Sequence, residues 1–211
     1  MTVQLHLLNA RGTLESIRAR VEDVFPPAVE TISALLPVSN IDVLVQAGPA
    51  VIPEIGIGGY TLAADLLRLT IDPASPNLLK DFATEFLAVL GHELHHCLRY
   101  DGPGYGRTLG EALVSEGLAC HFESELRGSA PFYARVLDQG ALQAMRARAH
   151  LELESNSYNH NAWFYGSVDL DIPRCAGYAL GFSIVEHYIH RWDTRASRLW
   201  NVPAETFYGG F

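Results

Sequence analysis

The sequence predicts an α+β protein in which a few strands near the start of the chain are followed by long helices. Two runs of β-branched and leucine residues, Ile41–Val45 and Leu66–Ile71, have the composition of buried strands. Helical periodicity dominates from about residue 78 to residue 192. The 211 residues contain no internal repeat and no low-complexity linker. We therefore expect a single domain over residues 1–211, with a small sheet at about 40–72.

The expected helices are separated by proline, glycine and aspartate, which commonly mark helix ends and turns. The first helical region, 13–36, contains Pro26 and Pro27, and we expect these prolines to interrupt it because proline removes a backbone donor. The other helices are expected at 78–100, 108–127, 131–154 and 174–192. The segment 155–172 is rich in Asn, Tyr and Asp, and we expect a loop there.

Charge and cysteine content limit the class of protein. The chain has 24 acidic and 15 basic residues, for a formal charge of −9, which disfavours a nucleic-acid partner or an anionic membrane surface. No apolar run approaches the roughly 20 residues needed to cross a bilayer. With three cysteines and no signal-like N-terminal pattern, we expect no disulfide framework and a cytoplasmic location. The oligomeric state is not indicated.

One motif on the expected helix 78–100 can carry chemistry. Residues 92–96 read His-Glu-Leu-His-His, the H-E-x-x-H pattern in which His92 and His96, one turn apart, can bind one metal ion. At about 100° per residue, Glu93 falls on an apolar face of this helix. That face contains Phe82, Phe86 and Val89. Because burying an uncompensated carboxylate costs several kcal/mol, a partner or a cation must lie near Glu93.

The next expected helix offers a third ligand. Glu116 lies far enough beyond His96 for one helix to end and a second to return alongside it. Its neighbours on the same face are apolar: Leu109, Ala112, Leu113, Ala119 and Cys120. Two histidines and one glutamate leave the fourth position of a zinc ion open, which is typical of catalytic sites. We therefore predict that His92, His96 and Glu116 bind one Zn²⁺ per chain.

Four other polar residues near these motifs have competing interpretations. Glu111, in Thr108-Leu-Gly-Glu111, matches a capping box and is interpreted as a helix cap. Glu123 is either a carboxylate that orients a ligand histidine or a solvated residue at the helix end. Cys120 is a small buried side chain that can support or line the site. His95 is expected behind the ligands or at the surface.

These motifs resemble those of the gluzincin metallopeptidases, in which H-E-x-x-H is followed by a ligand glutamate. Ser115-Glu-Gly-Leu-Ala119 is similar to the N-E-G-F-A segment of the aminopeptidase N group. Over roughly residues 40–190, the chain more closely resembles a bacterial family known mainly as predicted Zn-dependent proteases. Gly91 and Cys120 depart from the pattern usual in such sites, and Cys120 stands where thermolysin-like sites place a supporting carboxylate.

The resemblance implies a zincin-like fold, in which an extended substrate adds to the edge of a mixed sheet. The edge segment here is Gly58-Gly59-Tyr60, whose glycines allow close approach of a peptide, and a plain glycine turn is the alternative. Relatives also use a Tyr or His to stabilise the oxyanion. Tyr178 is the first candidate, followed by His160 and Tyr165, and each is equally consistent with a packed aromatic residue.

The sequence therefore predicts a zinc-dependent metallopeptidase acting on a peptide or protein substrate, with Glu93 as the general base. A zinc-dependent amidase or another hydrolase of a non-peptide substrate is the first alternative, because it would use the same residues. A non-catalytic zinc-binding or peptide-binding protein is the second, although such a site has no need of a buried carboxylate at Glu93.

Overall fold

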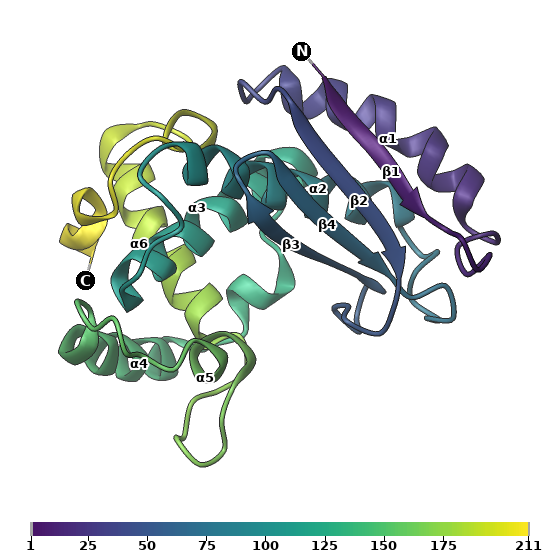
Figure 1. Cartoon of the computed structure of the whole chain (residues 1–211). Helices are drawn as coiled ribbons and strands as arrows, with labels where there is room; N and C mark the ends of the chain where they lie inside the picture. Colours follow the sequence, from purple (N-terminus) through teal and green to yellow (C-terminus); the bar gives the residue numbers. More distant parts are fainter. Residues whose placement is uncertain (1, 211) are drawn as a thin grey trace. The chain divides into compact units, whose positions relative to one another are not determined.

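A four-stranded mixed sheet is the framework of the N-terminal half of the chain (Figure 1). The computed structural model describes residues 2–210. The strands are β1 (Val3–Leu8), β2 (Ile41–Ala47), β3 (Ile57–Ala63) and β4 (Leu66–Ile71). They are ordered β1-β2-β4-β3, with β1, β2 and β4 parallel and β3 antiparallel to β4. The predicted α+β class and mixed sheet are confirmed, and β3 is an edge strand.

Strand β1 extends the sheet beyond the expected segment 40–72. Its side chains alternate between half-buried and exposed along the strand, the two-residue period of a strand with one covered face. It pairs with β2 along its whole length, with Val3 opposite Ile41 and Leu8 opposite Gln46. The expectation of a sheet confined to 40–72 is therefore wrong at this end.

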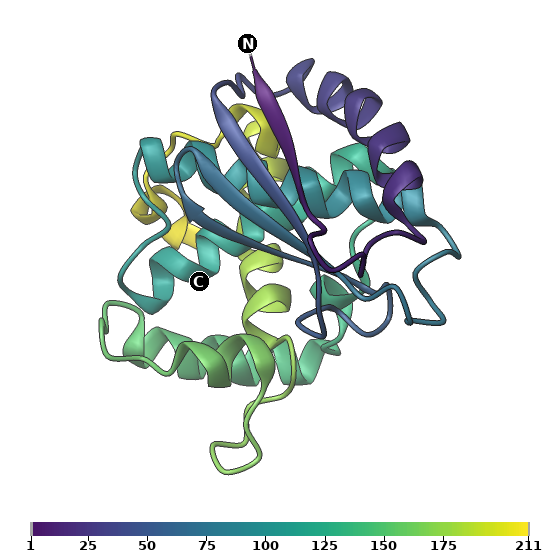
Figure 2. The same cartoon turned by 45° about the vertical axis from the view of Figure 1, so that its right-hand side comes forward.

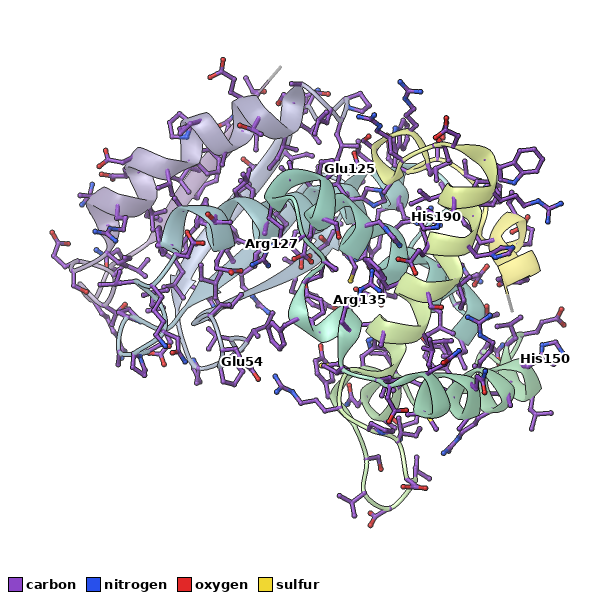
Figure 3. The ribbon with its side chains drawn as sticks, turned by 180° about the vertical axis from the view of Figure 1, so that it is seen from behind. Glu54, Glu125, Arg127, Arg135, His150 and His190 are labelled. Carbon is purple, nitrogen blue, oxygen red and sulfur yellow. The ribbon has the colours of Figure 1, made fainter. Side chains whose placement is uncertain are left out.

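Helices α1 (Arg18–Ser33) and α2 (Phe82–Asp101) cover the same face of the sheet, as the view from behind in Figure 3 shows. The strands direct alternate side chains toward these helices, and the core lies between the two layers. Val43 and Val45 of β2 and Leu67 and Leu69 of β4 are completely buried there. Helix α2 contacts β3 most extensively, so residues of α2 and of the edge strand lie side by side.

Helix α1 runs without a break through Pro26 and Pro27, so the predicted interruption is wrong. The apolar residues on either side of the prolines form one buried stripe: Val21, Phe25, Ala28 and Ile32. A proline inside a helix costs about 3 kcal/mol, so the pair costs about 6 kcal/mol. Burying each large apolar side chain contributes on the order of 2 kcal/mol, which is enough in sum to offset that cost.

The C-terminal half of the chain is almost entirely helical and packs around helix α6 (Ala176–Trp192). Its main partner is helix α3 (Leu109–Arg127), and the two backbones touch: a β-carbon on Gly117 would overlap the Gly181 carbonyl oxygen. Figures 1 and 2 both show helix α4 (Gln139–Glu152) lying across one end of α6. The remaining elements are α5 (His160–Tyr165) and three 3-10 helices, Phe132–Arg135, Ala196–Arg198 and Ala204–Gly210.

Two expectations in this half are wrong because capping residues create short helices. The expected helix 131–154 divides into a 3-10 turn and α4, which begins after Asp138, whose side chain accepts from the Ala141 amide. The expected loop 155–172 contains α5, capped by the Asn159 side chain. A six-residue helix is too short to show a convincing hydrophobic period, so only the cap could indicate it.

The chain divides into two compact units, Met1–Asp101 and Gly102–Phe211. The first holds the sheet with α1 and α2, and the second holds α3 to α6. The single domain expected over residues 1–211 stays a prediction. Within residues 2–210, no helix combines the length and the apolar character that crossing a bilayer requires.

Candidate active site

Helix α2 brings together the two histidines of the H-E-x-x-H motif. His92 and His96 are 7% and 4% exposed, and their Nε2 atoms lie 3.0 Å apart. Two nitrogen ligands of a tetrahedral zinc ion, each at about 2.05 Å, are about 3.3 Å apart. The pair thus has nearly the spacing that a shared zinc ion requires, as the i, i+4 positions of an unbroken helix predict.

The carboxylate of Glu93 packs directly against edge strand β3. It is 6% exposed, and the Thr61 hydroxyl donates to its Oε2 at 2.7 Å. The same hydroxyl also lies 2.9 Å from the main-chain carbonyl of Glu93. A β-carbon on Gly59 would overlap Glu93 Oε1, so only glycine leaves room for the carboxylate there. Strand β3 therefore fixes the orientation of a buried acid.

The segment predicted to hold substrate, Gly58-Gly59-Tyr60, forms part of β3. Gly58 and Gly59 pair in register with β4, so the alternative of a plain glycine turn is wrong. Tyr60 points away from Glu93, is 57% exposed, and packs against the Arg68 guanidinium. Whether this strand receives a substrate stays a prediction.

Glu116 occupies a comparable buried position in the second unit. It is 6% exposed on α3, and the Tyr105 hydroxyl donates to its Oε1 at 2.7 Å. Tyr105 comes from the loop before α3, where Gly104 and Gly106 both have positive φ. Burial, and then the Glu116 charge, raise the pKa of Tyr105 well above its usual value, so this phenol stays a donor.

An aromatic cluster lies beside Glu116 in the same unit. The His160 ring is 6.1 Å from Tyr105 and 4.6 Å from Phe164, centroid to centroid, and its Nδ1 lies 3.1 Å from the Tyr158 hydroxyl. Burial lowers the pKa of His160 while the Glu116 charge opposes that shift, and burial raises the pKa of Tyr158 to about 12. The cluster thus presents neutral donors and rings.

The three candidates for the oxyanion donor differ in their surroundings. Tyr178 on α6 is half-buried, with its ring 5.1 Å from those of Tyr133 and Phe164. His160 is half-buried at the start of α5. Tyr165, at the end of α5, is 63% exposed. Tyr178 and His160 therefore share the Phe164 ring as a neighbour, and Tyr165 is the most solvent-accessible of the three.

The two residues predicted to support the ligands, Glu123 and Cys120, are both buried on α3. Glu123 is 1% exposed and accepts a hydrogen bond from the Tyr133 hydroxyl, so the alternative of a solvated helix end is wrong. Burial, and then the charges of Glu123 and Glu116, raise the pKa of Cys120 well above its usual value. Their action on a ligand stays a prediction.

Three further residues near the motifs can be placed in the structure. Glu111 forms the predicted capping box with Thr108, and hydrogen bonds from the Thr108 and Arg107 amides lower the pKa of its carboxyl. His95 is completely buried, so a surface position is wrong for it. Cys97, two residues after His95, is also buried, and burial, followed by the Glu93 charge, raises the pKa of its thiol to about 12.

The donor set fits zinc. His92 and His96 in the first unit are two buried imidazoles, Glu116 in the second unit is a buried carboxylate, and these are the residue types found in catalytic zinc sites. The 3.0 Å separation of the imidazole nitrogens is the geometric observation that supports this fit.

Sequence reasoning missed the residues that hold the two carboxylates. Thr61 and Tyr105 belong to no recognised motif, and only their position after the Gly58-Gly59 pair and inside the Gly104-Tyr-Gly106 loop distinguishes them. In both cases a glycine-rich segment brings the backbone close to the helix that carries the acid. Such a segment between two ligand motifs is the signal that could have identified them.

Comparison with known proteins gives one family. The family model described as predicted Zn-dependent protease (DUF2268) matches residues 21–209. Searches of the curated proteins and of the solved structures found no significant match.

Proposed function

Because the chain belongs to the family of predicted Zn-dependent proteases, we propose that it is a zinc metallopeptidase that hydrolyses peptide bonds. The observation that carries this proposal is the buried Glu93 carboxylate, adjacent in sequence to a pair of imidazoles spaced for one metal ion. A structural zinc site needs no such acid beside its ligands, whereas a hydrolytic site needs a base.

The proposed ligands are His92, His96 and Glu116. A zinc ion held by them supplies Lewis-acid polarisation of the scissile carbonyl and lowers the pKa of water toward 7. Each side chain offers one donor atom, and two neutral imidazoles with one carboxylate leave a net positive charge to act on the substrate. The Tyr105 hydroxyl donates to Oε1 of Glu116 and so helps to orient this carboxylate as a ligand.

Glu93 is the proposed general base. Its carboxylate takes a proton from the attacking water and delivers it to the leaving amine nitrogen. The Thr61 hydroxyl donates to one oxygen of the Glu93 carboxylate, and Gly59 of strand β3 lies against the other oxygen. The two contacts hold the carboxylate in a fixed direction. General acid–base catalysis of this kind contributes about 10²–10⁴-fold to the rate.

Substrate binding and oxyanion stabilisation are assigned to two other parts of the chain. The edge strand β3, with Gly58, Gly59 and Tyr60, is proposed to pair with an extended peptide. Tyr178 or His160 is proposed to donate to the oxyanion, because both lie in the aromatic cluster beside Glu116. Supporting roles for Glu123 and Cys120 belong to the same proposal.

The Glu93→Gln variant tests the mechanism. We expect purified Glu93→Gln to contain one zinc ion per chain, as the wild type does, and to cleave a library of fluorogenic peptides at least about 100-fold more slowly. Zinc is measured by atomic absorption and the rate by fluorescence. Glu30→Gln, an exposed carboxylate on α1, is the matched control and should leave both quantities unchanged.

Two results would contradict the proposal. If the wild-type chain is purified without zinc and also fails to take up the ion, it has no zinc site. If Glu93→Gln cleaves peptides as fast as wild type, Glu93 is not the general base. Cleavage of small amides without cleavage of any peptide would instead assign the same site to an amidase.

A further inference from the structure

A cavity of about 510 Å³ lies beside helix α5 in the second unit. Its lining carries no charged side chain and consists of four polar residues, Asn159, Asn161, Tyr165 and Ser167, together with Ala162 and Gly166. Asn159, Asn161 and Tyr165 are exposed, so the cavity opens to solvent. After α5 the chain projects away from the rest of this unit as a turn closed by the Ser167–Ile172 bridge (Figures 1 and 2).

Helix α5 connects this cavity to the proposed catalytic centre. One face of the helix carries His160 and Phe164, whose rings contact each other at a tilt and belong to the cluster beside Glu116. The adjacent face carries Asn161 and Tyr165, one turn apart, and these line the cavity. The cavity and the aromatic cluster therefore lie against neighbouring faces of the same short helix.

The cavity offers hydrogen-bonding groups that the fold has not used. Asn159 Oδ1 accepts a hydrogen bond from the Ala162 amide at 3.0 Å, and its NH₂ group is available to a ligand. Within residues 2–210, the side-chain amide of Asn161 makes no hydrogen bond. Ser167 Oγ accepts from the Leu170 amide at 3.3 Å and keeps its own hydrogen to donate.

These groups favour a neutral ligand that both donates and accepts. A charged side chain would lose part of its hydration and meet no opposite charge in the lining. An apolar side chain would leave the asparagine amides without partners. An amide group has both a carbonyl acceptor and an N–H donor, so it can pair with the side-chain amide of an asparagine in the lining and brings no net charge.

We propose that this cavity is a substrate subsite that binds amide groups of the peptide, through Asn161, Asn159 and Ser167. This inference rests on the proposed metallopeptidase function and extends it to the part of the substrate beyond the scissile bond. The amide belongs either to an Asn or Gln side chain or to the main chain of an extended peptide. The exposed Tyr165 ring supplies a flat surface against which either one packs.

Binding of small probes to the full chain tests this site without any catalysis. We would titrate the ¹⁵N-labelled protein with N-acetylglutamine N-methylamide, with N-acetylalanine N-methylamide, and with the methyl ester of O-acetyllactate, which has no amide. The Asn161 side-chain NH₂ signals, assigned by their loss in Asn161→Ala, should shift saturably with an amide probe. The Asn77 amide, which already donates to the Pro53 carbonyl at 3.0 Å, should not move.

The probes distinguish the two sources of the amide. A shift with the glutamine probe alone supports a carboxamide side chain, and equal shifts with the glutamine and alanine probes support the main chain. The absence of a saturable shift with either amide, or an equal shift with the ester, overturns the inference. A stronger response to N-acetyllysine N-methylamide than to both neutral amides also overturns it, because it would mean that the cavity selects charge.

Kinetics separate this inference from the proposed function. For the best-cleaved peptide of the library, Asn161→Ala should raise KM about three- to tenfold, the effect of one lost hydrogen bond, with kcat unchanged. Asn156→Ala, an exposed asparagine outside the lining, is the control. An unchanged KM together with unshifted amide signals overturns the subsite alone. Amide binding in a protein that cleaves no peptide overturns the metallopeptidase proposal and leaves an amide-binding cavity.

Discussion

Glu93 and Glu116 are buried to the same extent, at 6% exposure each, but the two units hold them in different ways. In the first unit, Glu93 lies between helix α2, which carries it, and strand β3, and Thr61 of that strand donates to it. In the second unit, Glu116 lies under a loop, and the long side chain of Tyr105 reaches it from there. The hydrogen-bond donor that a buried carboxylate requires thus comes from a strand in the first unit and from a loop in the second.

Because of this difference, substitutions around Glu93 and around Glu116 should have different effects. Backbone packing leaves no space beside Glu93, because Gly59 is already as small as a residue can be. Glu116 instead accepts a hydrogen bond from the phenol hydroxyl of Tyr105, which a single substitution removes without altering the packing of the ring. We therefore expect steric changes to be most harmful in the first unit and loss of a hydrogen bond to be most harmful in the second.

The largest effect is expected for Gly59→Ala. The new β-carbon overlaps Glu93 Oε1, so the carboxylate must turn away from its present direction. Because general-base catalysis contributes about 10²–10⁴-fold, kcat should fall at least about 100-fold while the zinc content stays at one ion per chain. The rate on a fluorogenic peptide and the zinc content of the purified variant measure the two quantities.

Gly140→Ala is the matched control for that steric change. Its β-carbon would make an ordinary contact, 3.5 Å from Asp138 Oδ1, in the first turn of α4. Alanine is favoured over glycine in a helix, so this variant should be at least as stable as wild type and equally active. Equal activity of Gly59→Ala and Gly140→Ala would show that the β3 packing does not orient the base.

The next largest effect is expected for Tyr105→Phe, which keeps the ring and removes the hydrogen bond to Glu116. Loss of a group that orients a metal ligand typically lowers affinity about 10–100-fold. Zinc should therefore dissociate at correspondingly lower concentrations of a competing chelator. Tyr188→Phe removes a phenol from α6 whose ring packs on Trp192 and Phe207, and it should leave zinc affinity unchanged. Equal affinities for the two variants would mean that Glu116 is held in some other way.

The two acids also differ in how far the sequence could predict their surroundings. His92, Glu93 and His96 follow from one spacing rule, because i and i+4 positions face the same way in any unbroken helix. The buried carboxylate at Glu116 follows from the apolar residues around it. Thr61 and Tyr105 reach their acids across many residues, and no local period encodes such contacts.

The fold shows the same limit. Strands β2 and β4 were predictable from short apolar runs, and helices α2, α3 and α6 from long periodic segments, but the sheet order could not be derived from any of them. The continuity of α1 through Pro26 and Pro27 depends on the core that its apolar stripe meets, which is a tertiary effect. The predictable part is therefore the local geometry of each motif.

The histidines extend the contrast between the units. His92 and His96 form the proposed metal pair, whereas His121 in the second unit stacks on the Phe182 ring at 3.8 Å and donates from Nε2 to the Phe182 carbonyl at 2.9 Å. Burial lowers the pKa of His121 to about 4, against the opposing effects of that hydrogen bond and the Glu186 charge. His121 is thus a neutral packing residue at neutral pH.

This shift makes stability depend on pH in a defined window. The unfolded chain protonates His121 near pH 6.5 and the folded chain only near pH 4, so the free energy of unfolding falls as the pH drops through that range. Allowing for the partial exposure of the ring, the loss from this residue is about 2 kcal/mol. Urea unfolding at pH 7 and pH 4.5 should show that much less pH dependence in His121→Gln than in wild type. Identical pH dependence in both proteins would contradict the assignment.

The smallest effect is expected for Thr61→Val, which removes the hydroxyl beside Glu93 and keeps the shape of the side chain. A lost hydrogen bond to a charged group is worth about 1.5–3 kcal/mol, and Gly59 still restricts the carboxylate, so kcat should fall only about tenfold. Zinc affinity should not change, in contrast to Tyr105→Phe. Thr70→Val, at a buried threonine of β4, should alter neither quantity. A loss as large as that of Gly59→Ala would mean that the Thr61 hydroxyl, and not the packing of β3, orients the base. The two units would then hold their carboxylates by the same means.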